Sequence, residues 1–514
     1  MKIYSAHNLE CHRRLRGMHL SLFLRNLSKN SQVRQKTTTT NWGVIDILQR
    51  VKVSSVISGI FGPRNNNSLI DYEDEELEEN ETSKKHVYIA SQKTVASIQN
   101  RAVKLLYQIK KTKTEESQLQ KLNQLVHHMR EYPVTRALVK REGGIQTLLS
   151  LRHQTKDDEI RMYAKAALTI LGYADPVKEN GIRILSLDGG GTRGVITIQI
   201  LMKLEELTGQ RVHEMFDLIV GTSTGALLAF LLGIQRATLE EAMCFYDRLS
   251  AEVFKKPTVF ETGKLFFTHA FYDTESFVKV LRDIMGSDRC MIDTSFEEGL
   301  PKVAAVSTLV NHQVLQPYVF RNYYIPPLVP HNYLGSSRHK LWEALQASTA
   351  APGYFEECKL GSDIHQDGGL LTNNPCALAV HESKRLWPDT PLQTVVSIGN
   401  GVYHGRSGPN TASFSSLREK LMKLVAGATD VEAMHITLED LLPSTVYFRF
   451  NPNLSIDAFL DESDPKALDQ LKVDAKNYID KYEWKYQKAA DSLLQKKSSV
   501  RHVREKLALK LAML

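Results

Sequence analysis

Residues 183–234 read RILSLDGGGTRGVITIQILMKLEELTGQRVHEMFDLIVGTSTGALLAFLLGI, and the other parts of the chain can be interpreted from there. The stretch contains two glycine-rich loops, each behind a short apolar run and ahead of a helical pattern. An apolar run, a glycine turn and a helical pattern predict a buried strand, a tight loop and a helix. Because this order occurs twice in succession, the stretch favours an α/β domain.

The second loop contains the pattern G-x-S-x-G, in which Ser223 stands between Gly221 and Gly225. The apolar runs 216–220 and 226–232 give it the strand–turn–helix setting of a nucleophilic serine. Glycine permits the sharp turn because a larger side chain would meet neighbouring backbone. The N-terminus of the following helix favours developing negative charge. We therefore predict a nucleophile at Ser223, and the alternative is an ordinary loop between two core elements.

The first loop, residues 188–194, reads DGGGTRG and also matches G-x-G-x-x-G, so a nucleotide site must be considered. A dinucleotide site expects a second strand that ends in an acidic residue, whereas the next strand here ends in the serine loop. Consecutive glycine N–H groups can instead form an anion nest. Beside a nucleophilic serine, such a nest is an oxyanion hole. We predict an oxyanion hole at Gly189, Gly190 and Gly191, with Arg193 beside it; a nucleotide loop and a plain turn are the alternatives.

A carboxylate follows much later in the chain, where Asp367 opens the sequence D-G-G at the end of a short predicted strand. The glycines after it, Gly368 and Gly369, allow a sharp turn and leave the carboxylate unobstructed. A D-G-G sequence is by itself an ordinary turn. Its interpretation as part of a site depends on the two earlier loops.

The three motifs, in this order and at these separations, resemble those of the patatin-like phospholipases over roughly residues 181–384. The stretch 345–355, LQASTAAPGYF, is similar to an S-x-A-x-P-x-x-F segment of that family. A helical region ahead of the catalytic domain and a long tail behind it are similar to the gamma type of calcium-independent phospholipases. The resemblance implies a three-layer α/β/α catalytic domain. It also implies a serine acyl hydrolase that releases fatty acids from membrane glycerophospholipids without a metal ion or another cofactor.

The resemblance further implies a Ser–Asp dyad, in which Ser223 attacks the ester carbonyl and Asp367 takes the serine proton. The glycine nest holds the oxyanion, and an acyl-enzyme intermediate forms. The positions that support these loops are Arg193, Gly194, Gly221, Gly225 and Gly368. A free aspartate has a pKa of about 4 and is a weak base for a hydroxyl. We therefore expect partial burial to raise the pKa of Asp367.

A Ser–Asp–His triad would instead place a histidine after the aspartate. His381, His404 and His435 occupy later positions. His365 lies two residues before Asp367, and strand alternation would put both side chains on one face. An esterase or neutral-lipid lipase with a triad therefore stays open as an alternative. A lipid-binding scaffold without catalysis is a second alternative.

The composition is that of an ordinary globular protein, with 42% hydrophobic and 24% charged residues. The length of 514 residues is enough for two or three domains. The net charge of +7 comes largely from the N-terminal segment, so we expect no nucleic-acid partner. The five cysteines have no C-x-x-C spacing, which argues against a disulfide framework and against zinc. No apolar run is long enough and sufficiently free of charge to predict a membrane span, so we expect peripheral membrane association.

Five segments differ in composition. Residues 1–60 are basic and poor in acids, which is typical of a mitochondrial transit peptide, and residues 61–86 predict an acidic flexible linker. Residues 87–175 predict an α-helical, armadillo-like region, which is either a surface for a protein partner or a cap on the catalytic domain. Residues 180–386 are the predicted catalytic domain. Residues 387–514 are a C-terminal extension, mixed at first and then helical and basic.

The basic N-terminal segment predicts a mitochondrial, membrane-associated protein, in agreement with the gamma-type resemblance. A membrane-surface segment and a disordered leader are the alternatives for residues 1–40. The chain ends in Ala-Met-Leu rather than S-K-L, so a peroxisomal location is doubtful. The final helix, from about Trp484, carries basic residues among leucines. We expect it either to lie on an anionic membrane or to pack on the body of the protein.

Overall fold

The computed structural model describes residues 81–112, 114–253, 272–327, 329, 332–403 and 431–513. The predicted targeting segment, most of the predicted linker and His404 lie outside these residues.

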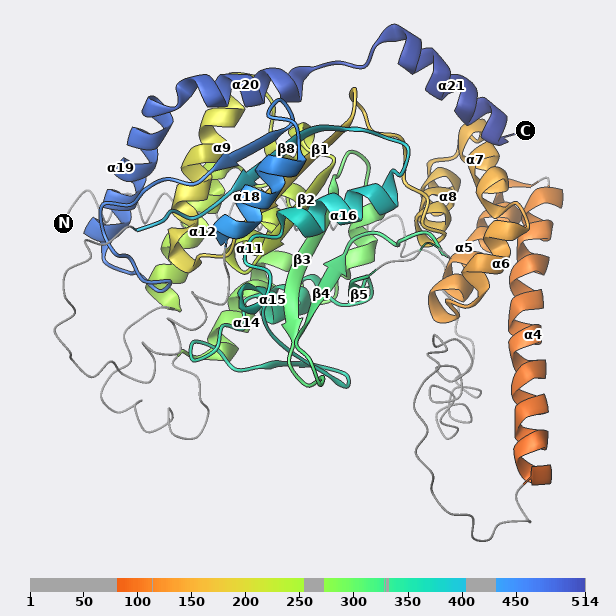
Figure 1. The fold of residues 1–514 in the computed structure, drawn as a ribbon. Coiled ribbons are helices and arrows are strands. Elements are labelled where there is room, and N and C mark those ends of the chain that lie inside the picture. The colour runs from red at the N-terminus through yellow and green to blue at the C-terminus, as the bar shows by residue number, and fades with distance from the viewer. Residues whose placement is uncertain are drawn as a thin grey trace. The chain divides into compact units, whose positions relative to one another are not determined.

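In the described residues, a nine-stranded sheet forms the centre of the catalytic part (Figure 1). Its main path follows the order β5–β4–β3–β2–β1–β8–β9, and β7 pairs with both β3 and β6. The strands are β1 Ile182–Leu187, β2 Leu218–Thr222, β3 Lys302–Leu309, β4 Gln316–Arg321, β5 Leu334–Ser336, β6 Cys358–Leu360, β7 Asp363–Asp367, β8 Leu392–Ile398 and β9 Tyr447–Phe450. Strands β3, β2, β1, β8 and β9 run parallel, whereas β4 and β7 run antiparallel to β3. The central strands are almost continuously buried and largely apolar, as expected for parallel strands covered on both faces.

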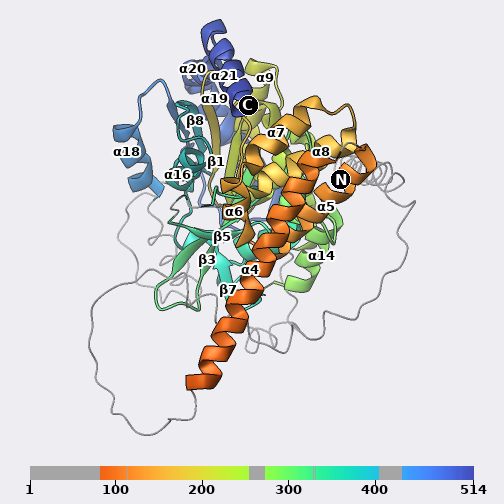
Figure 2. The ribbon, with the colours of Figure 1, turned by 90° about the vertical axis from the view of Figure 1, so that its right-hand side faces the viewer.

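Helices cover both faces of this sheet, as the two views in Figures 1 and 2 show. On one face, α16 (Cys376–Leu386) and α18 (Val431–Leu441) share an apolar cluster with the strands. On the other face lies α9 (Gly194–Thr208), in contact with α12 (Leu239–Glu252), α19 (Pro465–Lys481) and α20 (Glu483–Leu494). The other helical elements of the catalytic part are η1 Gly191–Arg193, α10 Val212–Met215, α11 Thr224–Leu228, η2 Ala229–Ile234, α14 Thr274–Met285, η4 Met291–Phe296, α15 Leu341–Ser348 and η5 Gly368–Leu370. The three-layer α/β/α prediction is therefore confirmed.

The C-terminal extension takes part in this architecture. Strand β8 pairs with β1, β9 pairs with β8, and α19 and α20 belong to the α9 layer. The core of the catalytic part therefore includes residues beyond the predicted boundary at residue 386. The final helix, α21 (Ser499–Met513), follows α20 and contacts the helical region.

The helical region consists of α4 Glu81–Lys111, α5 Glu115–Glu131, α6 Thr135–Arg141, α7 Gly144–Gln154 and α8 Asp158–Ile170. Helix α4 begins inside the stretch 61–86 that the sequence assigns to a linker. Buried residues between Ala102 and Leu171 form one apolar core of this region, which includes Leu106, Leu125 and Ala167. Helix α8 contacts η4 of the catalytic part, where the Lys165 ammonium donates to the Glu297 carbonyl at 2.9 Å. None of the described helices combines the length and the apolar character that crossing a membrane requires.

Candidate active site

Ser223 lies at a sharp turn between β2 and α11. Its φ of 54° and ψ of −121° fall in a region that residues with a side chain rarely adopt. Such a conformation costs about 1–3 kcal/mol and persists only where the surroundings enforce it. A side chain on Gly221 would overlap the backbone of Gly225, and one on Gly225 would overlap the Leu187 carbonyl. The two glycines of the motif therefore let the strand, the turn and the helix approach closely enough for this geometry.

Ser348 supports the turn from the end of α15. The backbone N–H of Ser223 donates to Ser348 Oγ at 3.0 Å. The Ser348 hydroxyl in turn donates to the Val306 carbonyl at 2.6 Å, and its side chain is fully buried. Ser348 belongs to the stretch 345–355 that resembles the family segment, but the sequence alone did not indicate its contact with the turn.

Asp367 meets Ser223 across 144 residues of sequence. Ser223 Oγ donates to Asp367 Oδ2 at 2.6 Å, and the Gly369 N–H donates to Asp367 Oδ1 at 2.7 Å. Strand β7 carries the aspartate to this position by pairing Asp367 with Ser307 of β3. A side chain on Gly368 would overlap the Val306 carbonyl, so this position in D-G-G requires glycine. The structure therefore brings the predicted serine and aspartate into direct contact.

The electrostatic environment of Asp367 changes its acidity. Burial raises the pKa of the Asp367 carboxyl to about 6, and the hydrogen bonds from Ser223 and Gly369 act against this rise. A carboxylate with a raised pKa is a stronger base than a free aspartate. The raised pKa that we expected burial to give Asp367 is therefore found in the structure.

The glycine loop lies against Ser223. A β-carbon on Gly189 would lie 3.2 Å from the β-carbon of Ser223. The Gly189 N–H donates to the Asn373 carbonyl at 3.2 Å and is therefore occupied. No described residue accepts a hydrogen bond from the N–H of Gly190 or Gly191. Of the three amides predicted for an oxyanion hole, these two have no hydrogen bond to a described residue.

The remaining glycines of this loop are required by protein neighbours. A side chain on Gly190 would overlap Asn400, and one on Gly191, where φ is 60°, would overlap the Leu460 carbonyl. That carbonyl accepts from the Thr192 N–H at 2.8 Å. In a dinucleotide site the glycines make room for a bound pyrophosphate. Here these glycines face other parts of the chain, which disfavours the nucleotide alternative.

Arg193 and Gly194 join the glycine loop to α9. The Arg193 Nε donates to the Gly190 carbonyl at 3.3 Å, so this side chain lies beside the predicted oxyanion site. A side chain on Gly194 would overlap the Tyr246 ring of α12. Both positions therefore fix the loop to its surroundings.

A buried ion pair that sequence reasoning missed anchors the start of the glycine loop. Arg449 Nη2 lies 2.6 Å from Asp188 Oδ2, and both side chains are almost fully buried. Arg449 Nη1 also donates to Ser397 Oγ at 2.9 Å. Burial raises the pKa of the Asp188 carboxyl, and the neighbouring Arg449 acts against this rise. The resulting pKa of about 6 leaves the pair ionised at neutral pH. The available signal was Arg449 itself, because it is the only charged residue in the strand sequence YFRF.

The candidate histidines lie elsewhere. His365 Nδ1 is 2.9 Å from Ser307 Oγ, and burial lowers the pKa of His365 to about 4. His381 packs edge-on against the Tyr333 ring, and His435 Nδ1 lies 3.2 Å from the hydroxyl of Tyr447. Among the described residues, no histidine hydrogen-bonds to the Ser223 hydroxyl or to the Asp367 carboxylate.

Comparison with known proteins gives consistent matches. Residues 185–380, which include Ser223, the aspartate and both loops, match the family model for patatin-like phospholipase. The chain is 44% identical to calcium-independent phospholipase A2-gamma of Mus musculus over 430 residues, 83% of this chain and 55% of the relative. It is 44% identical to the Homo sapiens protein of that name over 434 residues, 84% of this chain and 55% of the relative.

A more distant relative is the cGAMP-activated phospholipase of Vibrio cholerae, with 31% identity over 221 residues, 40% of this chain and 58% of that protein. The chain thus spans about half the length of these curated phospholipase A2-gamma relatives. The family match covers both glycine loops and the aspartate turn, where the geometry described above is found. On these grounds residues 185–380 of the chain form a patatin-like phospholipase domain.

Proposed function

We propose that this protein is a calcium-independent phospholipase A, a serine acyl hydrolase that releases fatty acids from membrane glycerophospholipids. The observation that carries the proposal is the hydrogen bond of 2.6 Å from Ser223 Oγ to the buried Asp367 carboxylate. A hydroxyl in contact with a carboxylate of raised pKa is a nucleophile with its general base. The names of the relatives supply the substrate class and the independence from calcium.

In the proposed first step, Ser223 Oγ attacks the ester carbonyl carbon while Asp367 accepts the hydroxyl proton. The carbonyl oxygen becomes an oxyanion, which the amides of Gly190 and Gly191 are free to bind. One such donor is worth about 3 kcal/mol in the transition state. The intermediate collapses, Asp367 returns the proton to the leaving lysophospholipid oxygen, and the acyl group stays on Ser223.

In the second step, Asp367 takes a proton from water, and the resulting hydroxide equivalent attacks the acyl-enzyme carbonyl. The same two amides bind the second oxyanion. Collapse releases the fatty acid, and the proton returns from Asp367 to Ser223 Oγ. The enzyme is then in its starting state, and no step of this mechanism requires a metal ion.

Two alternatives are less favoured by the contacts. A Ser–Asp–His triad needs a histidine beside the aspartate, whereas His365 contacts Ser307. A non-catalytic scaffold has no use for a strained Ser223 or for a buried carboxylate, and both features cost stability. These costs are typical of a catalytic site.

Location and partners follow as proposals. Because a glycerophospholipid substrate resides in membranes, we propose peripheral membrane association. We also propose a mitochondrial location from the basic composition of residues 1–60. Imaging the full chain and a chain without this segment would test the location, and mitochondrial signal from both would contradict the role of the segment. We propose the helical region as the surface available to a protein partner.

The decisive experiment measures fatty-acid release from phospholipid vesicles in the presence of EDTA. We expect release by the full chain and none above background by Ser223→Ala, while the exposed Ser287→Ala control keeps full activity. Equal release by the full chain and Ser223→Ala would overturn the nucleophile assignment. Release that requires added calcium would overturn the calcium-independent class. Faster release from a triacylglycerol emulsion than from vesicles would favour the neutral-lipid alternative.

A further inference from the structure

Helix α21 is attached to the rest of the protein along one face. Residues 497, 501, 505, 509 and 513, which recur every fourth position, are half-buried, and none of the helix's described residues is fully buried. Near its start, the Lys497 ammonium donates to the Val177 carbonyl at 2.7 Å. At its end, the Met513 carbonyl accepts from Ser150 Oγ of α7 at 3.0 Å. The inner face of α21 is therefore already partnered.

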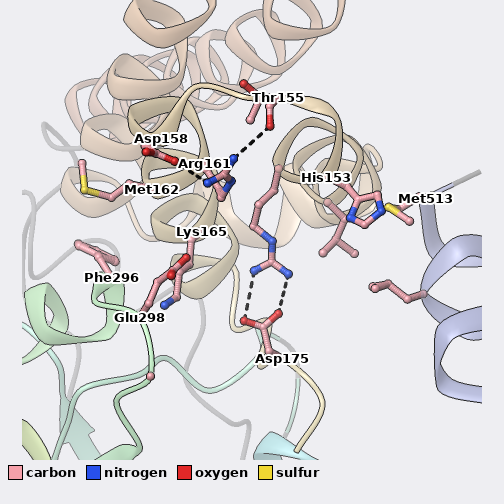
Figure 3. Close-up of a pocket in the computed structure, with 14 residues that line it drawn as sticks. His153, Thr155, Asp158, Arg161, Met162, Lys165, Asp175, Phe296, Glu298 and Met513 are labelled. Carbon is pink, nitrogen blue, oxygen red and sulfur yellow. Dashed lines mark hydrogen bonds and ion pairs between the residues drawn. The ribbon is translucent and has the colours of Figure 1, made fainter. Parts of the chain in front are cut away.

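The inner face borders a hollow, and its residues Leu509 and Met513 also pack against the apolar core of the helical region. A cavity of about 860 Å³ lies between α7, α8, the segment 296–299 and the inner residues Leu509 and Met513 of α21 (Figure 3). The Arg152–Asp175 ion pair, with a distance of 2.6 Å, crosses its lining. The helix therefore lies over the cavity, with a hydrogen bond to the rest of the protein near each end.

The opposite face of α21 carries an apolar row that we call the outer stripe, made of Val500, Val503, Leu507 and Leu511. These side chains are 80%, 56%, 55% and 70% exposed, respectively. Spacings of three and four residues place them on one side of the helix. Scattered exposed apolar residues are normal, but an aligned row marks an interaction surface. No described residue covers this row to any large extent.

Positive charge borders the outer stripe on both sides. At about 100° per residue, Arg504 lies on one side and Lys506 and Lys510 lie on the other. All three are exposed, as is Lys496 just before the helix. The only acidic residue in 496–513 is Glu505, which lies on the inner face and pairs with Lys497 and Arg501. The outward surface is therefore apolar at its centre and basic at its borders.

We propose that the outer stripe of α21 and its basic borders bind the surface of a membrane that contains anionic phospholipid. This inference rests on the proposed function, because it identifies the surface by which the enzyme reaches its substrate. Apolar side chains of such a helix enter the boundary between head groups and acyl chains, and Lys and Arg bind anionic head groups. A second copy of α21 fits less well, because the basic borders of two copies would repel each other.

The test is co-sedimentation of the full chain with phosphatidylcholine vesicles, with or without phosphatidylglycerol, at low and high salt. We expect binding that requires phosphatidylglycerol and weakens with salt. The double variant Val503→Glu/Leu507→Glu is expected to lose binding. Each neutralisation among Arg504→Gln, Lys506→Gln and Lys510→Gln should weaken binding about fivefold. The control variants Val473→Glu and Lys476→Gln, on the exposed side of α19, should bind as the unchanged chain does.

Two further measurements separate this inference from the proposed function. Ser223→Ala should bind vesicles normally although it releases no fatty acid, and the stripe variants should hydrolyse a soluble short-chain ester at the unchanged rate. Normal vesicle binding by the stripe variants would overturn the inference. Self-association of the unchanged chain through the outer stripe would also overturn it. So would binding of an acidic protein through the stripe without any binding to vesicles. Thermal unfolding of each variant confirms that these exposed substitutions leave the fold intact.

Discussion

The two loops beside the proposed nucleophile are held in place in different ways. The serine turn depends on nearby glycines of its own motif and on Ser348, which lies in another recognisable stretch. The glycine loop depends on Asn400, Leu460 and Arg449, and the ion pair from Asp188 to Arg449 spans 261 residues. The nucleophile is therefore organised mainly by short motifs, whereas the proposed oxyanion site requires the C-terminal extension. The contrast predicts that the serine turn is sensitive to variants close to it in its own motifs, whereas the glycine loop is sensitive to variants in the distant C-terminal extension.

The largest expected effect comes from replacing the proposed base, Asp367. Asp367→Asn should lower kcat on the order of 10²- to 10⁴-fold, because general base catalysis is lost. The same variant should be more stable than the unchanged chain at pH 7 by about 1–3 kcal/mol, since a buried carboxylate no longer has to ionise. Kinetics and denaturant unfolding on the same samples measure both. A variant that loses activity and stability together would show that the carboxylate is structural.

The second prediction tests the long-range support of the glycine loop. Arg449→Met leaves Asp188 buried without its partner and should destabilise the protein by about 3–5 kcal/mol. Activity on a soluble ester should also fall, by about 10²-fold, if the loop moves by roughly 1 Å. The matched control is Asp188→Asn/Arg449→Met, which removes both charges and should recover most of the stability. If the double variant is as unstable as the single one, the packing of Arg449 and not its charge supports the loop.

The third prediction concerns the local support of the serine turn. Ser348→Ala leaves the Ser223 N–H buried without its acceptor and should cost about 1–3 kcal/mol of stability. It should also lower kcat by about tenfold with little change in KM, because the nucleophile is less well positioned. Ser383→Ala is the control, since Ser383 is buried and hydrogen-bonded to the Val380 carbonyl within α16. Equal kinetics in both variants would show that Ser348 contributes to packing alone.

The same contrast explains which parts of the site could be predicted from the sequence. The serine, the aspartate and the glycines were predictable because each needs a specific residue type at a fixed local spacing. The strand before Ser223 and the helix after it were also predictable, because their apolar runs are clear. Arg449 was not predicted, since nothing local to β9 indicates that its partner is Asp188. His365 illustrates the limit of alternation as a guide, because it shares a strand with Asp367 but hydrogen-bonds to Ser307.

The last prediction concerns how kcat and the free energy of unfolding change with pH as Asp367 ionises. The proposed base acts as a carboxylate, so kcat on a soluble ester should rise with pH, reach half of its maximum near pH 6 and level off above it. The effect on stability has the opposite sign. The folded pKa of about 6 lies above the unfolded value of about 3.9, so the folded state keeps the proton longer. This contribution to stability is present below about pH 4 and is lost as pH rises through 6.

It follows that the extra stability of Asp367→Asn over the unchanged chain should appear only as pH rises through this range, and should vanish near pH 4. The small residual activity of Asp367→Asn should lack the rise near pH 6. Burial lowers the pKa of His365 to about 4, so this ring is already neutral near pH 6 and does not produce the rise there. If the rise persists in Asp367→Asn, the group that titrates is not the aspartate, and a histidine base becomes the better explanation. The stability and activity profiles together therefore test the dyad more strictly than loss of activity alone.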